Sequence, residues 1–166
     1  AAKAVRNGHV LVKPHPADDL AFIATVIEQH GDGRATLLLP SAGYHNVEVI
    51  CASDLFVSTV SSMFAAAAAL GRVSINIWRP DINLLYERGR WEKYNAISHG
   101  VETFEGMISA VKLFLSDSSA YRSEITRILD NLPRYFGGLA GTNALLAARL
   151  ALGGKVEQGA HLRRVS

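Results

Sequence analysis

The sequence predicts an α/β domain in which a parallel sheet is covered by helices on both faces, giving three layers. Two observations lead to this class. Short apolar segments alternate with segments of helical periodicity, and several of the apolar segments are continuous, as in strands buried on both faces. The chain has 166 residues, of which 49% are hydrophobic, and a chain of that size can bury one sizeable core. We therefore expect residues 1–166 to form a single domain.

The first half of the chain is predicted to alternate strictly between strand and helix. Its first helix has apolar residues at helical spacing, begins at Asp18 or Asp19, which suit a helix cap, and ends at Gly31. The run at 35–39 is wholly apolar apart from Thr36 and ends at Pro40, so it is predicted to be a strand buried on both faces. The predicted strands are residues 9–13, 35–39, 55–58 and 73–77, and the predicted helices are residues 20–30, 47–52 and 61–70.

The second half begins with a segment of weaker pattern. Residues 80–100 mix charges and aromatic side chains without a clear period, which predicts a long connection with a brief strand near 95–98. Thr103 is then expected to cap a helix. The buried face of this helix is predicted to be Met107, Ala110, Val111 and Phe114. A further helix is expected to end at Pro133, with an apolar face of Tyr121, Ile125, Ile128 and Leu129. A last helix is predicted at residues 145–152.

Composition excludes several classes of protein. The formal net charge is +2 and the charges are scattered, so no basic surface for nucleic acid is expected. Cys51 is the single cysteine; it is predicted to be a small buried residue, and a disulfide-free chain suits the cytosol. No apolar run reaches the length of a membrane span, no basic segment followed by an apolar stretch suggests a signal peptide, and His and Cys spacing predicts no metal site. The start at Ala1 rather than Met suggests a piece of a longer protein.

Two polar clusters follow predicted strands. Lys13-Pro14-His15-Pro16 comes after the first strand, and Ser58-Thr59-Val60-Ser61-Ser62 comes after the third, at the start of the alanine-rich helix. In an open parallel sheet, ligands bind outside the carboxyl ends of the strands. We therefore expect both clusters to lie at one edge of the sheet.

Each cluster suits a phosphate group. A helix start offers unpaired N–H groups and partial positive charge, to which the hydroxyls of Ser61 and Ser62 add donors. Prolines on both sides hold His15 in an extended conformation, and an imidazole beside a phosphate can donate a hydrogen bond or a proton. The competing interpretations are a serine that merely caps the helix and a histidine that is merely solvated. Asp18 and Asp19 are interpreted as helix-start acids, and Trp78 and Trp91 as packing residues, although a base could stack on Trp91 in the long connection.

Together these motifs resemble a known family. "KPHP" at 13–16 and "ASDLFVSTVSSMFAAAAALGRVSINI" at 52–77 resemble the carboxyl-terminal, donor-binding half of GT-B-fold glycosyltransferases that carry His-Pro and Ser-Ser motifs. These are bacterial sialyltransferases, capsule polysaccharide transferases and CDP-glycerol glycerophosphotransferases. "LYERGRW" at 85–91 resembles the Glu-Arg-Gly segment of the glycerophosphotransferases, which makes Glu87, Arg88 and Trp91 candidate nucleotide-loop residues. "GVETFEGMISAV" resembles the strand and helix that follow that segment, and "RYFGGLAGTNALLAARLA" resembles the closing helical tail.

The resemblance implies a Rossmann-like domain, one half of a GT-B fold, that binds a CMP-, CDP- or UDP-linked donor without metal or other cofactor. His15 would contact the donor phosphates and act in catalysis. Lys13, Ser58, Thr59, Ser61 and Ser62 would bind the phosphates with it and stabilise the leaving nucleotide. The transferred sugar or glycerol phosphate would extend a cell-surface polysaccharide such as a capsule. The resemblance also implies a cytoplasmic location, and allows peripheral association of the full-length protein with the inner face of the membrane.

Two departures from the family pattern concern the donor. Family members often carry an acid within the helix after the serines, where this chain has Ala66, and another just before the serine pair, where it has Thr59 and Val60. The amino-terminal acceptor domain, which in the family usually holds the catalytic base, is outside these residues. Two alternatives therefore remain: a UDP-N-acetylglucosamine 2-epimerase-like domain, and a non-catalytic Rossmann-like interaction module.

Overall fold

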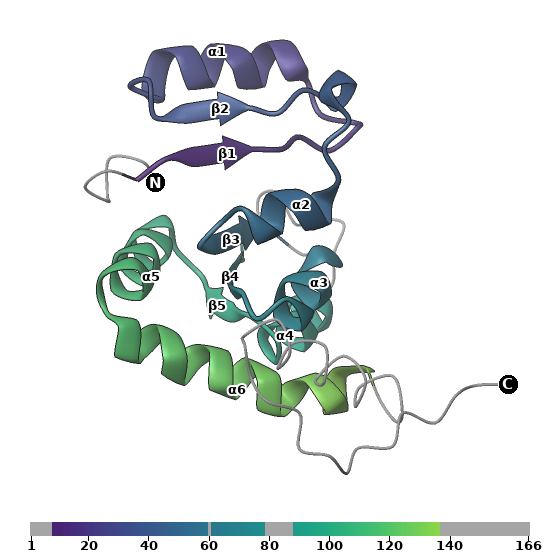
Figure 1. Ribbon diagram of the computed structural model, residues 1–166, viewed down its shortest axis with the longest axis vertical. Coiled ribbons are helices and arrows are strands. Elements are labelled where there is room, and N and C mark those ends of the chain that lie inside the picture. The colour runs from purple at the N-terminus through teal and green to yellow at the C-terminus, as the bar shows by residue number, and fades with distance from the viewer. Residues whose placement is uncertain (1–7, 60, 79–87, 137–166) are drawn as a thin grey trace, which may run out of the picture.

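The structure, a computed structural model, describes residues 8–59, 61–78 and 88–136 (Figure 1). It is an α/β fold with parallel strands in two small sheets flanked by helices, so the predicted class is confirmed. The strands are β1 (Val10–Val12), β2 (Ala35–Leu37), β3 (Leu55–Ser58), β4 (Val73–Ile77) and β5 (His99–Val101). The helices are α1 (Leu20–His30), α2 (Asn46–Cys51), α3 (Met63–Ala69), α4 (Arg88–Asn95), α5 (Phe104–Ser116) and α6 (Ser118–Phe136), with a 3₁₀ turn at Pro40–Ala42.

The first sheet pairs β1 with β2 and carries α1; we call residues 8–37 the N-terminal unit. Its local signals are confirmed. The carboxylate of Asp19 accepts hydrogen bonds from the N–H groups of Ala21 and Phe22, both at 3.0 Å, and Gly31 ends the helix by donating to Ile27 O at 2.7 Å. The predicted burial of the second strand is wrong, because β2 has no buried residue and α1 has none either. Two strands and one helix leave one face of the sheet uncovered.

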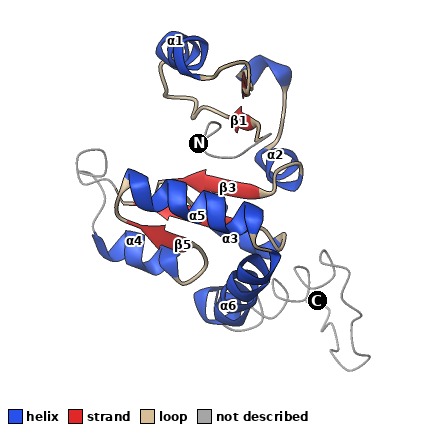
Figure 2. Cartoon of the chain, turned by 90° about the vertical axis from the view of Figure 1, so that its left-hand side faces the viewer, coloured by secondary structure: helices blue, strands red, loops and turns tan. Residues whose placement is uncertain are grey.

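The second sheet has the order β3-β4-β5 and holds the core; we call residues 53–136 the C-terminal unit. Helix α5 lies on one face of this sheet, and α3 and α4 lie on the other (Figures 1 and 2). Strand β4 is central, and four of its five residues are buried. The predicted face of α5 is confirmed, because its buried residues are Met107, Ala110, Val111 and Phe114.

Helix α6 crosses the amino ends of the three strands of this sheet (Figure 1). The hydroxyl of Tyr121 donates to Asp54 O, just before β3, and accepts from the N–H of Val73, the first residue of β4, both at 3.3 Å. The guanidinium of Arg127 donates to Ser98 O, just before β5. The amino ends are therefore closed by a helix. The predicted end of this helix at Pro133 is wrong, since α6 continues to Phe136.

The segment predicted as a long connection is in part a helix. Trp91 is 6% exposed, and Tyr94, three residues later on α4, packs its ring against Phe64 with 5.6 Å between centroids. The charged residues around these two aromatic side chains hide the helical period. The strand that follows is β5 at His99–Val101 rather than 95–98. Residues 79–87 and the last predicted helix, at 145–152, lie outside the described residues.

Cys51 is exposed rather than buried, because it is the last residue of the short helix α2, of which only Ile50 is buried. None of the helices in the described part of the chain combines the length and apolar character that crossing a bilayer requires.

Candidate functional site

The cluster after β1 forms a tight turn around His15. The backbone N–H of His15 donates to the Asp18 carboxylate at 2.8 Å, and the N–H of Ala17 donates to Nδ1 of the His15 ring at 3.2 Å. Pro14 is buried, whereas Lys13, His15 and Pro16 are exposed. Because Nδ1 accepts a hydrogen bond, the neutral ring carries its proton on Nε2, a donor suited to an anionic oxygen.

The cluster after β3 begins α3. Ser61 Oγ accepts from the N–H of Met63 at 3.2 Å, and the carbonyls of Ser61 and Ser62 accept from the N–H groups of Phe64 and Ala65, also at 3.2 Å. Ser61 is not the N-cap residue, which is Ser62, but its hydroxyl and carbonyl oxygens occupy N–H groups of the first turn, so few of these remain for a phosphate. The hydroxyl of Ser62 is exposed and does not cap the helix, and Ser58 and Thr59 are half-buried. Hydroxyl groups rather than backbone N–H groups are the main donors at this edge.

The structure does not bring the two clusters together. β1 and β3 belong to different sheets, and within the described residues no hydrogen bond or ion pair joins residues 13–16 to residues 58, 59, 61 and 62. In Figure 1 the strands β1 and β2 lie across the view, whereas β3, β4 and β5 point nearly along the line of sight. In Figure 2, which is turned by 90°, β3 lies across the view, so the strands of the two sheets run in different directions. Each cluster follows the strand that the sequence predicts, but the shared edge is absent from this arrangement.

The candidate nucleotide-loop residues have different positions. Glu87 lies outside the described residues, and Arg88 is the first residue of α4. Trp91 Nε1 donates to Asn76 O at 3.4 Å, and its ring lies 5.7 Å from that of Trp78. In this arrangement the Trp91 side chain is buried, which leaves no exposed ring face on which a base could stack. The packing interpretation of Trp91 is confirmed.

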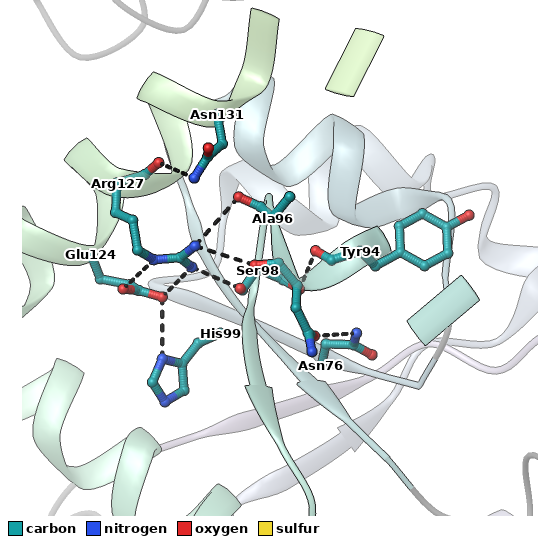
Figure 3. A network of polar contacts seen from close by, with 9 residues as sticks. Asn76, Tyr94, Ala96, Ser98, His99, Glu124, Arg127 and Asn131 are labelled. Carbon is teal, nitrogen blue, oxygen red and sulfur yellow. Dashed lines mark hydrogen bonds and ion pairs between the residues drawn. The ribbon is translucent and has the colours of Figure 1, made fainter. Parts of the chain in front are cut away.

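A polar network between α6 and the start of β5 was missed by the sequence analysis (Figure 3). Arg127 makes two hydrogen bonds to the Glu124 carboxylate, at 2.9 and 2.7 Å, and the same carboxylate contacts Nδ1 of His99 at 3.1 Å. The guanidinium also donates to the carbonyls of Asn95, Ala96 and Ser98. Since α4 ends at Asn95, Arg127 places its charge at the negative end of that helix.

Glu124 is the carboxyl group of the described residues whose pKa is clearly shifted. Burial alone would raise its pKa, but hydrogen bonds from His99 and Arg127 and the charge of Arg127 outweigh it and lower the pKa from 4.5 to about 2. The network therefore contains a pair that is charged at neutral pH and ties α6 to the connection before β5. The sequence signal for this network was the Glu-x-x-Arg pair of Glu124 and Arg127 on the predicted apolar face of a helix. The partners of these two side chains lie 25 to 32 residues away in the sequence and could not be predicted.

Asn76 forms a second buried polar contact, in the middle of β4. Its Nδ2 donates to Asn95 Oδ1 at 2.9 Å and to Trp91 O at 3.3 Å, so it ties the strand to α4. Gly100 makes room for this contact, because a Cβ at that position would lie 2.5 Å from Cγ and Nδ2 of Asn95. A polar residue inside the apolar strand "VSINI" was the sequence signal.

A groove of about 590 Å³ lies at the amino ends of β3 and β4, between the end of α5 and the start of α6. Its charged lining residues are Asp54, Arg72 and Arg122, and the Arg72 guanidinium donates to Cys51 O at 2.9 Å. This edge is opposite to the one where parallel sheets bind ligands. Within the described residues no group of three His, Cys, Asp or Glu side chains is placed to hold a metal ion.

Comparison of the chain with protein-family models, with curated proteins and with solved structures finds no match.

Proposed function

We propose that this chain is the donor-nucleotide-binding half of a metal-independent glycosyltransferase or glycerophosphotransferase of cell-surface polysaccharide synthesis. The observation that carries the proposal is the asymmetry of the C-terminal unit. Helix α6 covers the amino ends of β3, β4 and β5, and the hydroxyl cluster stands at the carboxyl end of β3, where α3 begins. That is the edge of a parallel sheet at which ligands bind.

In this proposal the donor's phosphates lie against the hydroxyls of Ser58, Thr59 and Ser62, Lys13 supplies positive charge, and His15 donates a hydrogen bond from Nε2. The bond between donor phosphate and transferred group breaks, the nucleotide leaves with the electron pair, and the acceptor oxygen forms the new bond. Stabilising the negative charge on the leaving nucleotide is the task of these residues. The acceptor site and catalytic base belong to a separate amino-terminal domain, and the proposal includes a cytoplasmic location.

The test is a titration with CMP, CDP and UDP, followed by the chemical shifts of the backbone amides. We expect the shifts to change at residues 58–63, and the double variant Ser58→Ala/Ser62→Ala to weaken binding about ten-fold or more, as expected for two lost hydrogen bonds to a charged group. Ser109→Ala is the matched control, because Ser109 is exposed on α5 and bonds only its own helix. Unchanged amides at 58–63 with millimolar nucleotide, or changes confined to the groove of Arg72 and Arg122, would rule the proposal out.

A second candidate, the non-catalytic interaction module, is favoured by the exposed apolar side chains of the first half of the chain. Phe22 is 66% exposed, Tyr44 is 52% exposed and Val47 is 48% exposed. A tight dimer in sedimentation, together with a His15→Ala variant of unchanged nucleotide affinity, would favour this candidate. A clear preference for UDP-N-acetylglucosamine over cytidine nucleotides would instead favour the epimerase-like alternative.

A further inference from the structure

Two strands of the structure have a free edge. β1 pairs with β2 and β3 pairs with β4, and within the described residues neither strand has a partner on its other side. Val10 donates to Arg34 O and Val12 accepts from Leu38, so these two residues face β2. Because alternate residues of a strand face opposite sides, the N–H and C=O groups of Leu11 face the free edge. In both views β1 is the strand of its sheet nearer to β3 (Figures 1 and 2).

The N-terminal unit also has an uncovered face. Val10, Val12, Ala35 and Leu37 are half-buried on one face of its sheet, whereas Leu11 and Thr36 are exposed on the other. Leu11 is 38% exposed, and Val47, on α2, is 48% exposed. Helix α2 already packs beside α3, on the face of the second sheet that carries Phe56. A helix in that position can cover the Leu11 face once the two sheets are side by side.

We propose that the free edge of β1 pairs in parallel with the free edge of β3, which joins the two sheets in the order β2-β1-β3-β4-β5. The chain from residue 38 to residue 54, which contains α2, is longer than the roughly dozen residues that a parallel crossover needs. Pairing satisfies the backbone groups of both edges and removes two exposed strand edges. It is a conformational change between two arrangements of the same elements.

The side-chain faces fix the register of the new pair. Phe56 lies on the α3 face, because its ring packs on Phe64 with centroids 5.6 Å apart. Leu11 must join that face to be covered by α2, so it pairs with Phe56. Val10 then pairs with Leu55, and Val12 with Val57. Both strands consequently end at the same edge of the joined sheet, with Lys13 beside Ser58.

In the joined sheet the clusters at residues 13–16 and 58–62 lie next to each other and form one phosphate site, whereas in the two separate sheets they are apart. Neighbouring strands lie about 4.8 Å apart, which brings the turn of His15 next to the hydroxyl cluster at the start of α3. The joining of the sheets goes beyond the proposed function, because the edges can pair whether or not a nucleotide binds.

Disulfide trapping in the whole chain, without nucleotide and in a Cys51→Ala background, tests the proposal. Val12→Cys/Val57→Cys is the test pair, because its Cβ atoms point to one face of the joined sheet within reach of a disulfide. Val10→Cys/Ala35→Cys is the positive control, since these residues are partners in the β1–β2 pair. Thr36→Cys/Val57→Cys is the negative control, because β2 is separated from β3 by β1 in the joined order. Lys13→Cys/Ser58→Cys is a second test pair if the first fails to fold by circular dichroism.

We expect intramolecular oxidation of a test pair, seen as the loss of two hydrogens in the monomer's mass, at a rate within about ten-fold of the positive control. We expect the negative control to stay reduced. A folded test pair that stays reduced while the positive control closes would overturn the proposal. Oxidation of the test pair and the negative control at equal rates would also overturn the proposal, because it would indicate random collision of the cysteines. Nucleotide binding is measured separately, so failure of the proposed function leaves this result intact.

Discussion

The N-terminal and C-terminal units contain the same kinds of element but differ in burial. In the N-terminal unit, α1 and the strands β1 and β2 have no buried residue. In the C-terminal unit, Phe64, Val73, Ile75, Ile97, Ile128 and Leu132 are fully buried. The hydrophobic core cluster draws all its members from this second unit.

The difference lies in the number of layers. β4 has a strand on each side and helices on both faces, so its side chains are enclosed. Among the residues that the structure describes, β1 has a neighbour on one side only, and no helix lies over its Leu11 face. A parallel sheet needs cover on both faces. We therefore expect most of the stability to reside in the C-terminal unit, and substitutions in the two units test this difference.

The largest contrast is expected between two phenylalanines. Phe64 is fully buried and its ring contacts those of Phe56 and Tyr94, so Phe64→Ala should lower the free energy of unfolding by about 3–5 kcal/mol. Phe22, on α1, is 66% exposed, so Phe22→Ala should change it by less than about 0.5 kcal/mol. Urea denaturation measures both. Equal losses would contradict the assignment of the core to one unit.

A smaller effect is expected at the contact between β5 and α4. Gly100→Ala should cost about 1–3 kcal/mol, because the added Cβ overlaps the Asn95 amide. Gly89→Ala, on α4 with open space around it, should be neutral or stabilise by up to about 1 kcal/mol. In an Asn95→Ala background the cost of Gly100→Ala should shrink. An unchanged cost in that double-mutant cycle would show that the overlap is not with Asn95.

The smallest effect is expected at the Glu124 network and depends on pH. The folded state lowers the pKa of Glu124 from 4.5 to about 2, so its stabilising contribution is present above about pH 4.5 and is lost as the pH falls toward 2. Glu124→Gln should therefore reduce the fall in stability between these pH values. Glu28→Gln, which removes an exposed carboxylate on α1, is the matched control for the loss of one carboxylate. The measurement is thermal unfolding of each variant between pH 2 and pH 5. Identical pH profiles of stability for the wild-type chain and the Glu124 variant would contradict a stabilising role of the network.

Local signals in the sequence predicted much of the fold. The bounds of β3 and β4 match the prediction, because each is a mainly apolar segment that begins directly after a charged residue. The cap at Asp19, the end at Gly31 and the buried face of α5 also follow from neighbouring residues. Helix α4 was missed because charges surround its two packing aromatic residues.

Non-local features were beyond prediction. Local patterns identify β1 and β3 as strands and place a polar cluster after each, but they do not determine whether the two edges pair. The same holds for the contacts of His99 and Arg127, whose partners are distant in the sequence. The sequence thus predicted the parts of the candidate phosphate site, whereas their convergence depends on how the two sheets are arranged.

Residue-resolved amide hydrogen exchange is the most direct test of the contrast between the two units. We expect the amides of β4, such as Ile75, to exchange only through global unfolding. Helix α1 buries no residue, so its amides, such as Ile27, should exchange through local opening at least about a hundred-fold faster. Equal protection of Ile27 and Ile75 would show that both units unfold together and would contradict the account.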